Sequence, residues 1–426
     1  MKFNYCGCQI FMSLPLFLAQ RLSLKSTANN GSTGILIAVI GITLSVIVMV
    51  VSISVMMGFR HEIRQKVIGF DSQISIGSRQ TSDSESFGLI SKRDLDTARE
   101  ILPSDASVAL TVRQPAIIKT RDNFSGAIIK GVDNEYDWSF LRGNLVEGSI
   151  PDFKADSTLY HIIVSRTLAN TLDLERGQKV DTYFLGNGAY RARRLTIAGI
   201  YDTHFSEYDR NMIFGSLSML QQVASVPDSC ATIAEINGLS DDNAIDEISS
   251  ELSEAYLEEL YTGKTDRMYS IVNIHETAAL YFNWLALLDT NVKVILTLMS
   301  LLTILTLISS LFILILRRVN TIGILKAIGA SDRLVRETFI FMAIRILACG
   351  LLIGNVIGVG LLYIQKFTKI IPLDPESYYL DHVPVMIDWI SILLLNAGIV
   401  AMSFIVLLFP SAIVSTIPPS KAINYE

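Results

Sequence analysis

Four long stretches without a charged residue constrain the fold of this chain more than any other feature. They cover residues 34–57, 294–316, 346–365 and 390–417. An α-helix rises about 1.5 Å per residue, so about 20 apolar residues cross the roughly 30 Å hydrocarbon core of a bilayer. Helices in the core of a soluble protein rarely run so far without a charge. The sequence therefore predicts a membrane protein with four transmembrane helices.

These stretches divide the chain into a predicted series of segments. The prediction is a cytoplasmic N-terminus with an amphipathic elbow at 1–33, transmembrane helix 1 at 34–58, an extracytoplasmic α+β domain with stalk helices at 59–293, transmembrane helix 2 at 294–316, a cytoplasmic coupling helix at 317–337, transmembrane helix 3 at 338–365, an extracytoplasmic loop at 366–388, transmembrane helix 4 at 389–417 and a cytoplasmic tail at 418–426.

The distribution of Lys and Arg predicts which segments face the cytoplasm. Residues 317–345 carry six basic and two acidic side chains, whereas residues 366–388 carry two basic and four acidic ones. The long segment 59–293 has 23 basic against 34 acidic residues. Short loops rich in Lys and Arg stay in the cytoplasm. Both termini and the 317–345 segment are therefore predicted inside, and the two acidic segments outside.

The N-terminus allows more than one interpretation. Residues 10–19 form a short apolar run interrupted by Pro15, without the small-residue cleavage site of a signal peptide. We interpret it as an amphipathic helix on the inner leaflet. Translation could start at Met1 or at Met12, and the sequence does not decide between them.

The extracytoplasmic segment alternates short strand and helix patterns, which predicts an α+β domain rather than a regular parallel sheet. Strands are predicted at 72–76, 108–113, 116–119, 127–132, 161–165, 179–184 and 194–201, helices at 166–174, 216–224 and 241–256, stalk helices at 59–68 and 274–289, and mobile stretches at 78–86 and 260–265.

Motifs for catalysis or metal binding are lacking in this sequence. It contains no G-x-x-x-x-G-K-[ST] run for ATP, no H-E-x-x-H and no G-x-S-x-G. His204 lies near Glu207 and Asp209, which suggests a metal or acid–base site, but a polar loop at a strand end is the favoured interpretation. Cys349 is predicted to be a buried apolar thiol. We therefore predict a non-catalytic chain without its own cofactor or metal.

Small residues mark one face of the third span. Gly350, Gly354 and Gly358 recur every fourth residue, and such faces let helix backbones approach closely. Two alternatives stay open, packing within the chain and an interface between subunits. No span carries a charge near its middle, which argues against an ion channel or a proton-coupled carrier and favours an apolar or lipid-like substrate.

The basic segment 317–337 lies between two spans and reads as a short helix with glycines at Gly323 and Gly329. Such a segment indicates contact with a cytoplasmic partner. Residues 318–331 resemble the coupling segment of the FtsX/MacB permease superfamily. Residues 35–76, with Ser-Val-Met-Met-Gly-Phe-Arg-His-Glu-Ile at 54–63, and residues 199–209 resemble the LolC/LolE permeases of the lipoprotein-releasing system.

The resemblance covers nearly the whole chain, with two departures. Thr321 stands where many members carry an acid, and the loop that recruits a periplasmic carrier in some members is not recognisable in residues 107–115. The resemblance implies a bacterial inner-membrane permease that extracts lipoproteins from the outer leaflet by mechanotransmission. It also implies a second permease, identical or homologous, and a periplasmic lipoprotein carrier as a further partner; nucleic acid is not expected.

The resemblance also implies that the energy comes from two copies of a separate ABC ATPase, which bind ATP and Mg²⁺. The residues expected to couple to it are Arg317, Arg318, Gly323, Lys326, Gly329, Ala330 and Ser331. Arg318 and Lys326 would meet acidic surface on the ATPase. Acyl chains of the substrate would contact Met49, Val50, Ile53 and Met57, although ordinary packing explains these four residues equally well.

Two alternative functions stay open. A MacB-like exporter or an FtsX-like regulator of cell-wall hydrolases belongs to the same superfamily, but MacB-like chains usually carry a fused ATPase and FtsX-type outer domains are generally shorter. A membrane-anchored extracytoplasmic sensor belongs to another class. The coupling segment argues against the sensor, because a passive anchor has no use for one.

Overall fold

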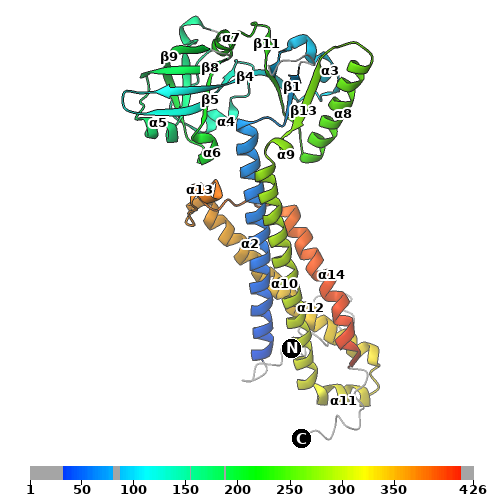
Figure 1. The fold of residues 1–426 in the computed structure, drawn as a ribbon. Coiled ribbons are helices and arrows are strands. Elements are labelled where there is room, and N and C mark those ends of the chain that lie inside the picture. The colour runs from blue at the N-terminus through cyan, green and yellow to red at the C-terminus, as the bar shows by residue number, and fades with distance from the viewer. Residues whose placement is uncertain (1–31, 80–86, 154, 187–188, 414–426) are drawn as a thin grey trace, which may run out of the picture. The chain divides into compact units, whose positions relative to one another are not determined.

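The computed structural model describes residues 32–79, 87–153, 155–186 and 189–413. Four of its helices are long and apolar enough to cross a membrane, namely α2 (Ser32–Phe70), α10 (Ala279–Arg317), α12 (Asp332–Thr368) and α14 (Trp389–Ile413) (Figure 1). The four predicted spans are thus confirmed. The predicted N-terminal elbow lies outside the described residues.

The chain divides into two compact units. Among the described residues, the membrane unit comprises 32–59, 286–371 and 383–413, and the sheet unit comprises those within 60–285 and 372–382. Because α2 and α10 each belong partly to both units, two helices run without a break from one unit into the other.

Helices α12 and α14 of the membrane unit are joined by a polar pair. The amide of Asn355 donates to Oδ1 of Asn396 at 2.8 Å, and the amide of Asn396 donates back at 3.0 Å. Each amide also donates to the carbonyl four residues earlier in its own helix, at 2.7 Å. Amide pairs fix the relative position of helices where lipid offers no competing partner. The pair was not predicted, because the two asparagines are uncharged and lie 41 positions apart in the sequence.

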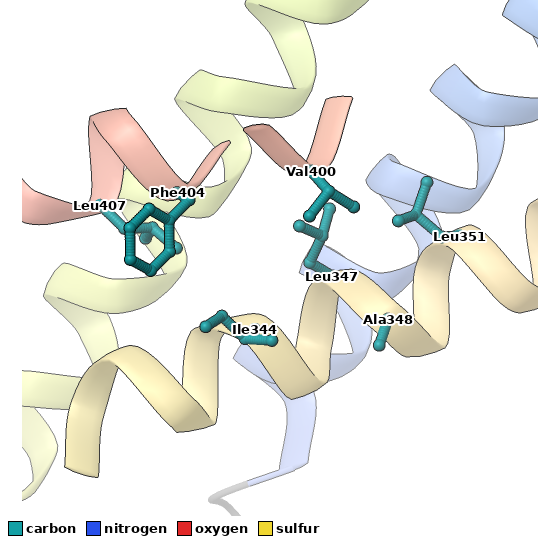
Figure 2. Close-up of a pocket in the computed structure, with 7 residues that line it drawn as sticks. All are labelled: Ile344, Leu347, Ala348, Leu351, Val400, Phe404 and Leu407. Carbon is teal, nitrogen blue, oxygen red and sulfur yellow. The ribbon is translucent and has the colours of Figure 1, made fainter. Parts of the chain in front are cut away.

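The same two helices line an apolar cavity of about 100 Å³ (Figure 2). Its walls are Ile344, Leu347, Ala348 and Leu351 of α12 and Val400, Phe404 and Leu407 of α14. No lining side chain carries a polar group, so the cavity suits hydrocarbon rather than water.

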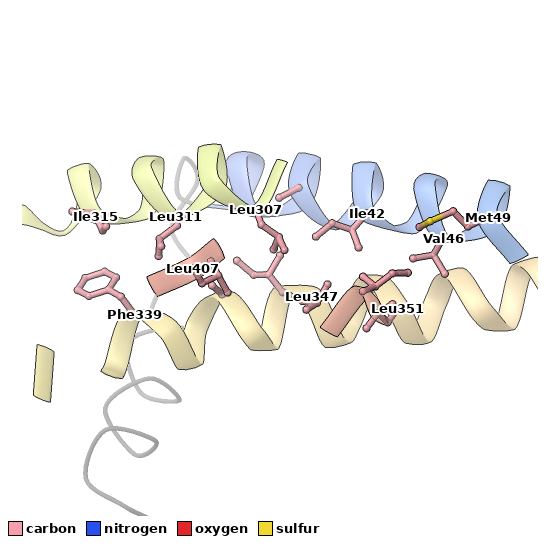
Figure 3. Close-up of a cluster of buried hydrophobic side chains, with 14 of the residues drawn as sticks. Ile42, Val46, Met49, Leu307, Leu311, Ile315, Phe339, Leu347, Leu351 and Leu407 are labelled. Atoms are coloured by element: carbon pink, nitrogen blue, oxygen red, sulfur yellow. The ribbon is translucent and has the colours of Figure 1, made fainter. Parts of the chain in front are cut away.

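The core of the membrane unit is formed by side chains from all four long helices (Figure 3). It includes Ile42, Val46 and Met49 of α2, Leu307, Leu311 and Ile315 of α10, Phe339, Leu347 and Leu351 of α12, and Leu407 of α14. Other large apolar side chains, such as Leu298, Val356 and Leu393, are exposed on the outside of the unit. Helices that are apolar on all sides are expected in lipid.

The glycine row of α12 packs against α2 of the same chain. A Cβ atom would lie 2.6 Å from Cγ2 of Ile42 if added to Gly350, 2.7 Å from Cβ of Val46 if added to Gly354, and 3.5 Å from Cβ of Val50 if added to Gly358. At the first two positions the approach leaves no room for a side chain. Of the two alternatives left open by the sequence, the structure shows packing within the chain.

The sheet unit is built on one mixed sheet of 11 strands. The order is β13-β1-β12-β4-β5-β10-β7-β9-β6, with β2 paired to β1 and β8 paired to both β4 and β9. The pairs β5/β10 and β7/β9 are parallel, and the other described pairs of this sheet are antiparallel. This arrangement confirms the predicted combination of α and β structure.

The bounds of the remaining elements are as follows. The strands are β1 (Ile74–Arg79), β2 (Phe87–Gly88), β3 (Ile90–Ser91), β4 (Ser107–Lys119), β5 (Phe124–Val132), β6 (Leu145–Gly148), β7 (His161–Ser165), β8 (Lys179–Gly186), β9 (Ala189–Tyr201), β10 (Met212–Ser216), β11 (Cys230–Ala231), β12 (Ile233–Asn237) and β13 (Met268–Asn273). The helices are α3 (Asp96–Ile101), α4 (Ser139–Gly143), α5 (Arg166–Leu172), α6 (Ser206–Asp209), α7 (Leu217–Ala224), α8 (Asp242–Tyr261), α9 (Ile274–Thr277), α11 (Val319–Ala327) and α13 (Pro375–Tyr378), with short 3₁₀ turns η1 (Lys92–Leu95) and η2 (Asp156–Thr158).

Several predicted elements differ from the structure for identifiable reasons. The predicted strands 108–113 and 116–119 form one strand, β4, which Pro115 does not interrupt. Pro115 lies opposite Ile128 of β5, and the N–H of Ile128 donates to the carbonyl of Asn211 at 2.7 Å instead of to β4. No donor from Pro115 is needed there. Strand β12 was missed because Glu235, a fully buried carboxylate, interrupts its apolar pattern.

The predicted stalk helix 274–289 is interrupted near its start. The side chain of Asn273 accepts from the N–H of Glu276 and caps the short helix α9, and α10 begins only at Ala279. The stalk predicted at 59–68 is the end of α2, which extends to Phe70. Of the two stretches predicted to be mobile, 80–86 lies outside the described residues, and 260–265 holds the end of α8 and a turn at Gly263 with φ of 73°.

Candidate functional site

The segment predicted as one coupling helix at 317–337 contains two helices and a turn, which corrects the prediction. Helix α11 ends at Ala327, Gly329 has a φ of 100°, and α12 begins at Asp332. The hydroxyl of Ser331 accepts from the N–H of Leu334 at 3.4 Å and caps α12. Glycine reaches the left-handed conformation without strain, so Gly329 permits the reversal between the helices.

Lys326 holds this turn together. Its ammonium lies 2.9 Å from Oδ1 of Asp332, and only 8% of its side chain is exposed. The lysine therefore pairs across the turn within the chain. The expectation that Lys326 meets acidic surface on a partner is not supported by this position.

The other predicted coupling residues have different surroundings. Gly323 is buried inside α11, and Ala330 packs against the core of the membrane unit. Arg317 is exposed at the end of α10, and Arg318 is half-buried. The structure thus assigns Gly323 and Ala330 to packing and places Arg317 at the surface.

An apolar ridge on α11 was not predicted. Ile324 is 54% exposed and Ile328 is 79% exposed, and Asn320 and Ala327 are exposed on the same face. Positions four and seven residues apart share a helix face. Arg333, whose side chain is 85% exposed, lies in the first turn of α12. The signal in the sequence was the four-residue spacing of isoleucines in an otherwise basic segment.

The four candidate substrate-contacting residues fall into two groups. Met49 and Val50 have no exposed surface and belong to the core between α2 and its neighbours. For these two residues the structure favours the alternative of ordinary packing. Ile53 and Met57 are half-buried and keep part of their surface accessible.

The segment 372–382, which connects α12 to α14, packs on the sheet unit. The carbonyl of Tyr379 accepts from the ammonium of Lys66 at 3.0 Å, and the Tyr379 ring lies edge-on to Phe205 and Tyr281, with centroids 5.4 and 5.3 Å apart. Arg210 also forms an ion pair with Glu376 of this segment. The sequence distinguishes this loop only by its acidic residues, but the structure shows that it packs against side chains of the sheet unit.

His204 binds carboxylates from two segments but has no metal-like surroundings. Its Nδ1 lies 2.9 Å from Asp202, and its Nε2 lies 3.6 Å from Asp381 of the segment 372–382. Neither Glu207 nor Asp209 is its partner. Among the described residues there is no group of three or more His, Cys, Asp or Glu side chains that could hold a metal ion.

Asp209 is buried and organises the turn that follows β9. Its carboxylate accepts from the backbone N–H groups of Thr203 and Phe205 at 3.2 and 3.3 Å and from the Thr203 hydroxyl at 2.7 Å. Burial raises the pKa of Asp209 to about 6, although the donors from Thr203 and Phe205 oppose this shift. The role of the carboxylate is to satisfy donors that the turn leaves unpaired.

Two cysteines lie in the described part of the chain. Cys349 is exposed on the surface of α12, so the prediction of a thiol buried within the chain was wrong. The physical reason is that α12 turns its small residues toward α2, and Cys349 precedes Gly350 on a different face. Cys230 is a half-buried free thiol.

Comparisons with known proteins agree with this architecture. Residues 35–255 match the model of the MacB-like periplasmic core domain family, and residues 293–419 match that of the FtsX-like permease C-terminal family. The first match covers more than half of the chain and includes α2 and most of the sheet unit.

Curated relatives are similar over nearly the whole chain. The lipoprotein-releasing system transmembrane protein LolC of Xylella fastidiosa (strain Temecula1 / ATCC 700964) is 22% identical, over 97% of this chain and 99% of that protein. LolE of the same system from Haemophilus influenzae is 20% identical, over 97% of this chain and 100% of its own length.

A solved structure of the periplasmic region of MacB from Actinobacillus actinomycetemcomitans is also similar to part of the chain. It shares 16% identity, with a TM-score of 0.33, over 51% of this chain and 98% of that structure. The two family matches follow the order of the parts in the structure, with the large domain between the first and second membrane helices. The chain therefore belongs to the MacB-like periplasmic core domain family, and it is an ABC transporter permease of the FtsX-like type.

Proposed function

We propose that this permease releases lipoproteins from the outer leaflet of a bacterial inner membrane and hands them to a periplasmic carrier. The observation that carries the proposal is the similarity to LolC along 97% of this chain and 99% of the relative, without a large insertion or missing domain. Both termini would lie in the cytoplasm and the sheet unit in the periplasm, as the distribution of Lys and Arg predicts.

The energy for this work would come from a separate ATPase subunit, present in two copies and binding ATP with Mg²⁺. The ridge of Ile324 and Ile328 supports such a partner, because large apolar side chains on a water-facing helix usually mark a protein interface. The excess of basic over acidic residues in 317–345 would steer it toward an acidic surface.

The substrate would enter from the side, between two permease subunits that are identical or homologous. Of the four residues first considered for acyl contact, Ile53 and Met57 retain accessible surface on α2. No charge lies near the middle of the spans to bind an ion or a proton. A lipid-anchored substrate that stays in the outer leaflet fits this apolar lining.

A MacB-like exporter is the second candidate, and the match of residues 35–255 to the MacB-like periplasmic core favours it. An FtsX-like regulator of cell-wall hydrolases is a related alternative supported by the match of residues 293–419. A passive sensor would have no use for the apolar ridge on α11.

Affinity purification of the tagged permease from solubilised membranes, followed by mass spectrometry, distinguishes these functions. Recovery of a P-loop ATPase together with triacylated proteins is the expected result. Recovery of the ATPase with an efflux adaptor or a cell-wall hydrolase would replace the proposal by the second candidate. If no ATPase is recovered, even after mild crosslinking, the transport proposals fail together.

A further inference from the structure

The last turn of α2 is enclosed in the centre of the sheet unit. Phe70 is fully buried, its ring stacks on Tyr208 with centroids 4.7 Å apart, and Phe140 meets it edge-on at 5.4 Å. A Cβ atom on Gly69 would overlap the ring of Phe140, so a glycine is required for this approach. Aromatic rings therefore pack around the end of the helix and restrict its lateral movement.

Side chains of the sheet unit also donate to the last carbonyl groups of the helix. The ammonium of Lys130 donates to the carbonyl of Phe70 at 2.9 Å, and Nη2 of Arg113 reaches the same oxygen at 3.5 Å. The hydroxyl of Tyr136 donates to the carbonyl of Gly69 at 3.3 Å. A helix leaves its last carbonyls unpaired and carries partial negative charge there, so these cations complement it.

Two of these donors, Lys130 and Arg113, also form ion pairs with buried carboxylates. Lys130 lies 2.7 Å from Oε2 of Glu235, and both side chains are 0% exposed. Arg113 lies 2.9 Å from Oε1 of Glu235 and 2.7 Å from Oδ1 of Asp71, the residue that follows α2. Burial lowers the pKa of Lys130 to about 8, and the charge of Glu235 opposes this shift.

Three neighbouring strands supply this network. Arg113 belongs to β4, Lys130 to β5 and Glu235 to β12, which lie side by side in the middle of the sheet. A buried ion pair adds little net stability, because desolvation of the charges offsets their attraction. It does impose one geometry, since removing either partner leaves a buried charge unpaired. A role in fixing the position of α2 accounts for the cost of burying these charges.

We infer that Lys130, Arg113 and Glu235 form a rigid joint that fixes the end of α2 to the centre of the sheet. Because α2 is one helix from Ser32 to Phe70, its rotation or displacement is transmitted to three central strands and is not absorbed by a loop. The use of this joint in lipoprotein release rests on the proposed function, but its rigidity does not. The three side chains are positioning residues and touch no substrate.

Distances between two spin labels test the rigidity directly. His61 on α2 and Lys119 on β4 are exposed, so both are changed to Cys in a full-length chain whose four native cysteines are replaced by Ser. The protein is placed in lipid nanodiscs and the distance distribution is measured by pulsed electron paramagnetic resonance. We expect a narrow distribution for the parent and a distribution about twofold broader for the Lys130→Met, Glu235→Gln variant, because the helix end then samples several orientations.

The Asp242→Asn variant is the matched control. It removes ion pairs of α2 with α8, from Arg60 at 3.3 Å and Arg64 at 2.9 Å, whose side chains all keep some exposed surface, whereas Lys130 and Glu235 are 0% exposed. Such pairs contribute little, so the width should stay that of the parent. Broadening in this control alone, or an unchanged width in the Lys130→Met, Glu235→Gln variant, would overturn the inference.

Tyr136→Phe keeps the experiment decisive if the charge variant does not fold. It removes one hydroxyl and no charge, and a smaller but measurable broadening is expected; a width equal to that of the parent would then count against the joint. The measurement needs neither ATPase nor lipoprotein. A permease that proves not to release lipoproteins would therefore leave this result intact, and a flexible joint would leave the proposed function open.

Discussion

A single buried carboxylate, Asp209, makes the stability of the sheet unit depend on pH. Its pKa is raised from the ordinary 3.8 to about 6. The folded protein therefore binds this proton more tightly than the unfolded chain does. The resulting stabilisation is fully present below about pH 4 and is lost as the pH rises through about 6, and it corresponds to at most about 3 kcal/mol.

The Asp209→Asn variant isolates this contribution. Its amide oxygen can accept from the N–H groups of Thr203 and Phe205, and its NH₂ can donate to the Thr203 hydroxyl, so the turn keeps its hydrogen bonds. We expect the variant to melt at a temperature less dependent on pH between 5 and 8 than the wild type and to be the more stable at pH 8. Parallel pH profiles for the two proteins would show that Asp209 is not the titrating group.

At the scale of elements, the contact between α2 and α12 depends on the absence of side chains at specific glycines. The Gly354→Ala substitution places a methyl group 2.7 Å from Cβ of Val46 and should lower the free energy of unfolding by about 1–3 kcal/mol. Gly360 of the same helix has no neighbouring atom within 4 Å of such a methyl group. Gly360→Ala should therefore leave the melting temperature in detergent unchanged or slightly raised. Equal losses in the two variants would mean that the close approach of Val46 to Gly354 does not account for the effect.

The ridge on α11 is the second element whose role can be tested. The double substitution Ile324→Glu, Ile328→Glu should reduce recovery of the partner ATPase about tenfold or more, because apolar anchors carry much of the affinity of an interface. The melting temperature of the permease should not fall, since both side chains are largely exposed.

Phe124→Glu is the control for this variant, because Phe124 is 77% exposed but belongs to the sheet unit. It should leave recovery of the ATPase unchanged, as judged by quantitative immunoblotting of the purified complex. If as much ATPase is recovered when both isoleucines are replaced, its docking site does not lie on α11.

At the scale of the whole molecule, the sequence predicted the parts that depend on periodicity and charge. The four spans are marked by the absence of charge, and β7 at His161–Ser165 by a short apolar run with turn signals on either side. The features it missed depend on contacts distant in the chain. Glu235 looks like a surface residue until Lys130, more than a hundred positions earlier, is seen to neutralise it. Lys326 looks available until Asp332 is brought near by the turn at Gly329.

The orientation in the membrane is a property of the whole chain that the distribution of Lys and Arg predicts and that cysteine labelling can test. Tyr190 in the sheet unit and Ala327 in α11 are both exposed, so each can be changed to Cys in a chain whose native cysteines are replaced by Ser. A membrane-impermeant maleimide should label Tyr190→Cys in spheroplasts and Ala327→Cys only in inverted vesicles. Six basic residues in 317–345 would each have to be carried across the membrane in the opposite orientation, which makes that arrangement unfavourable. Labelling of Ala327→Cys in intact spheroplasts would therefore contradict the predicted topology and the placement of the ATPase on α11.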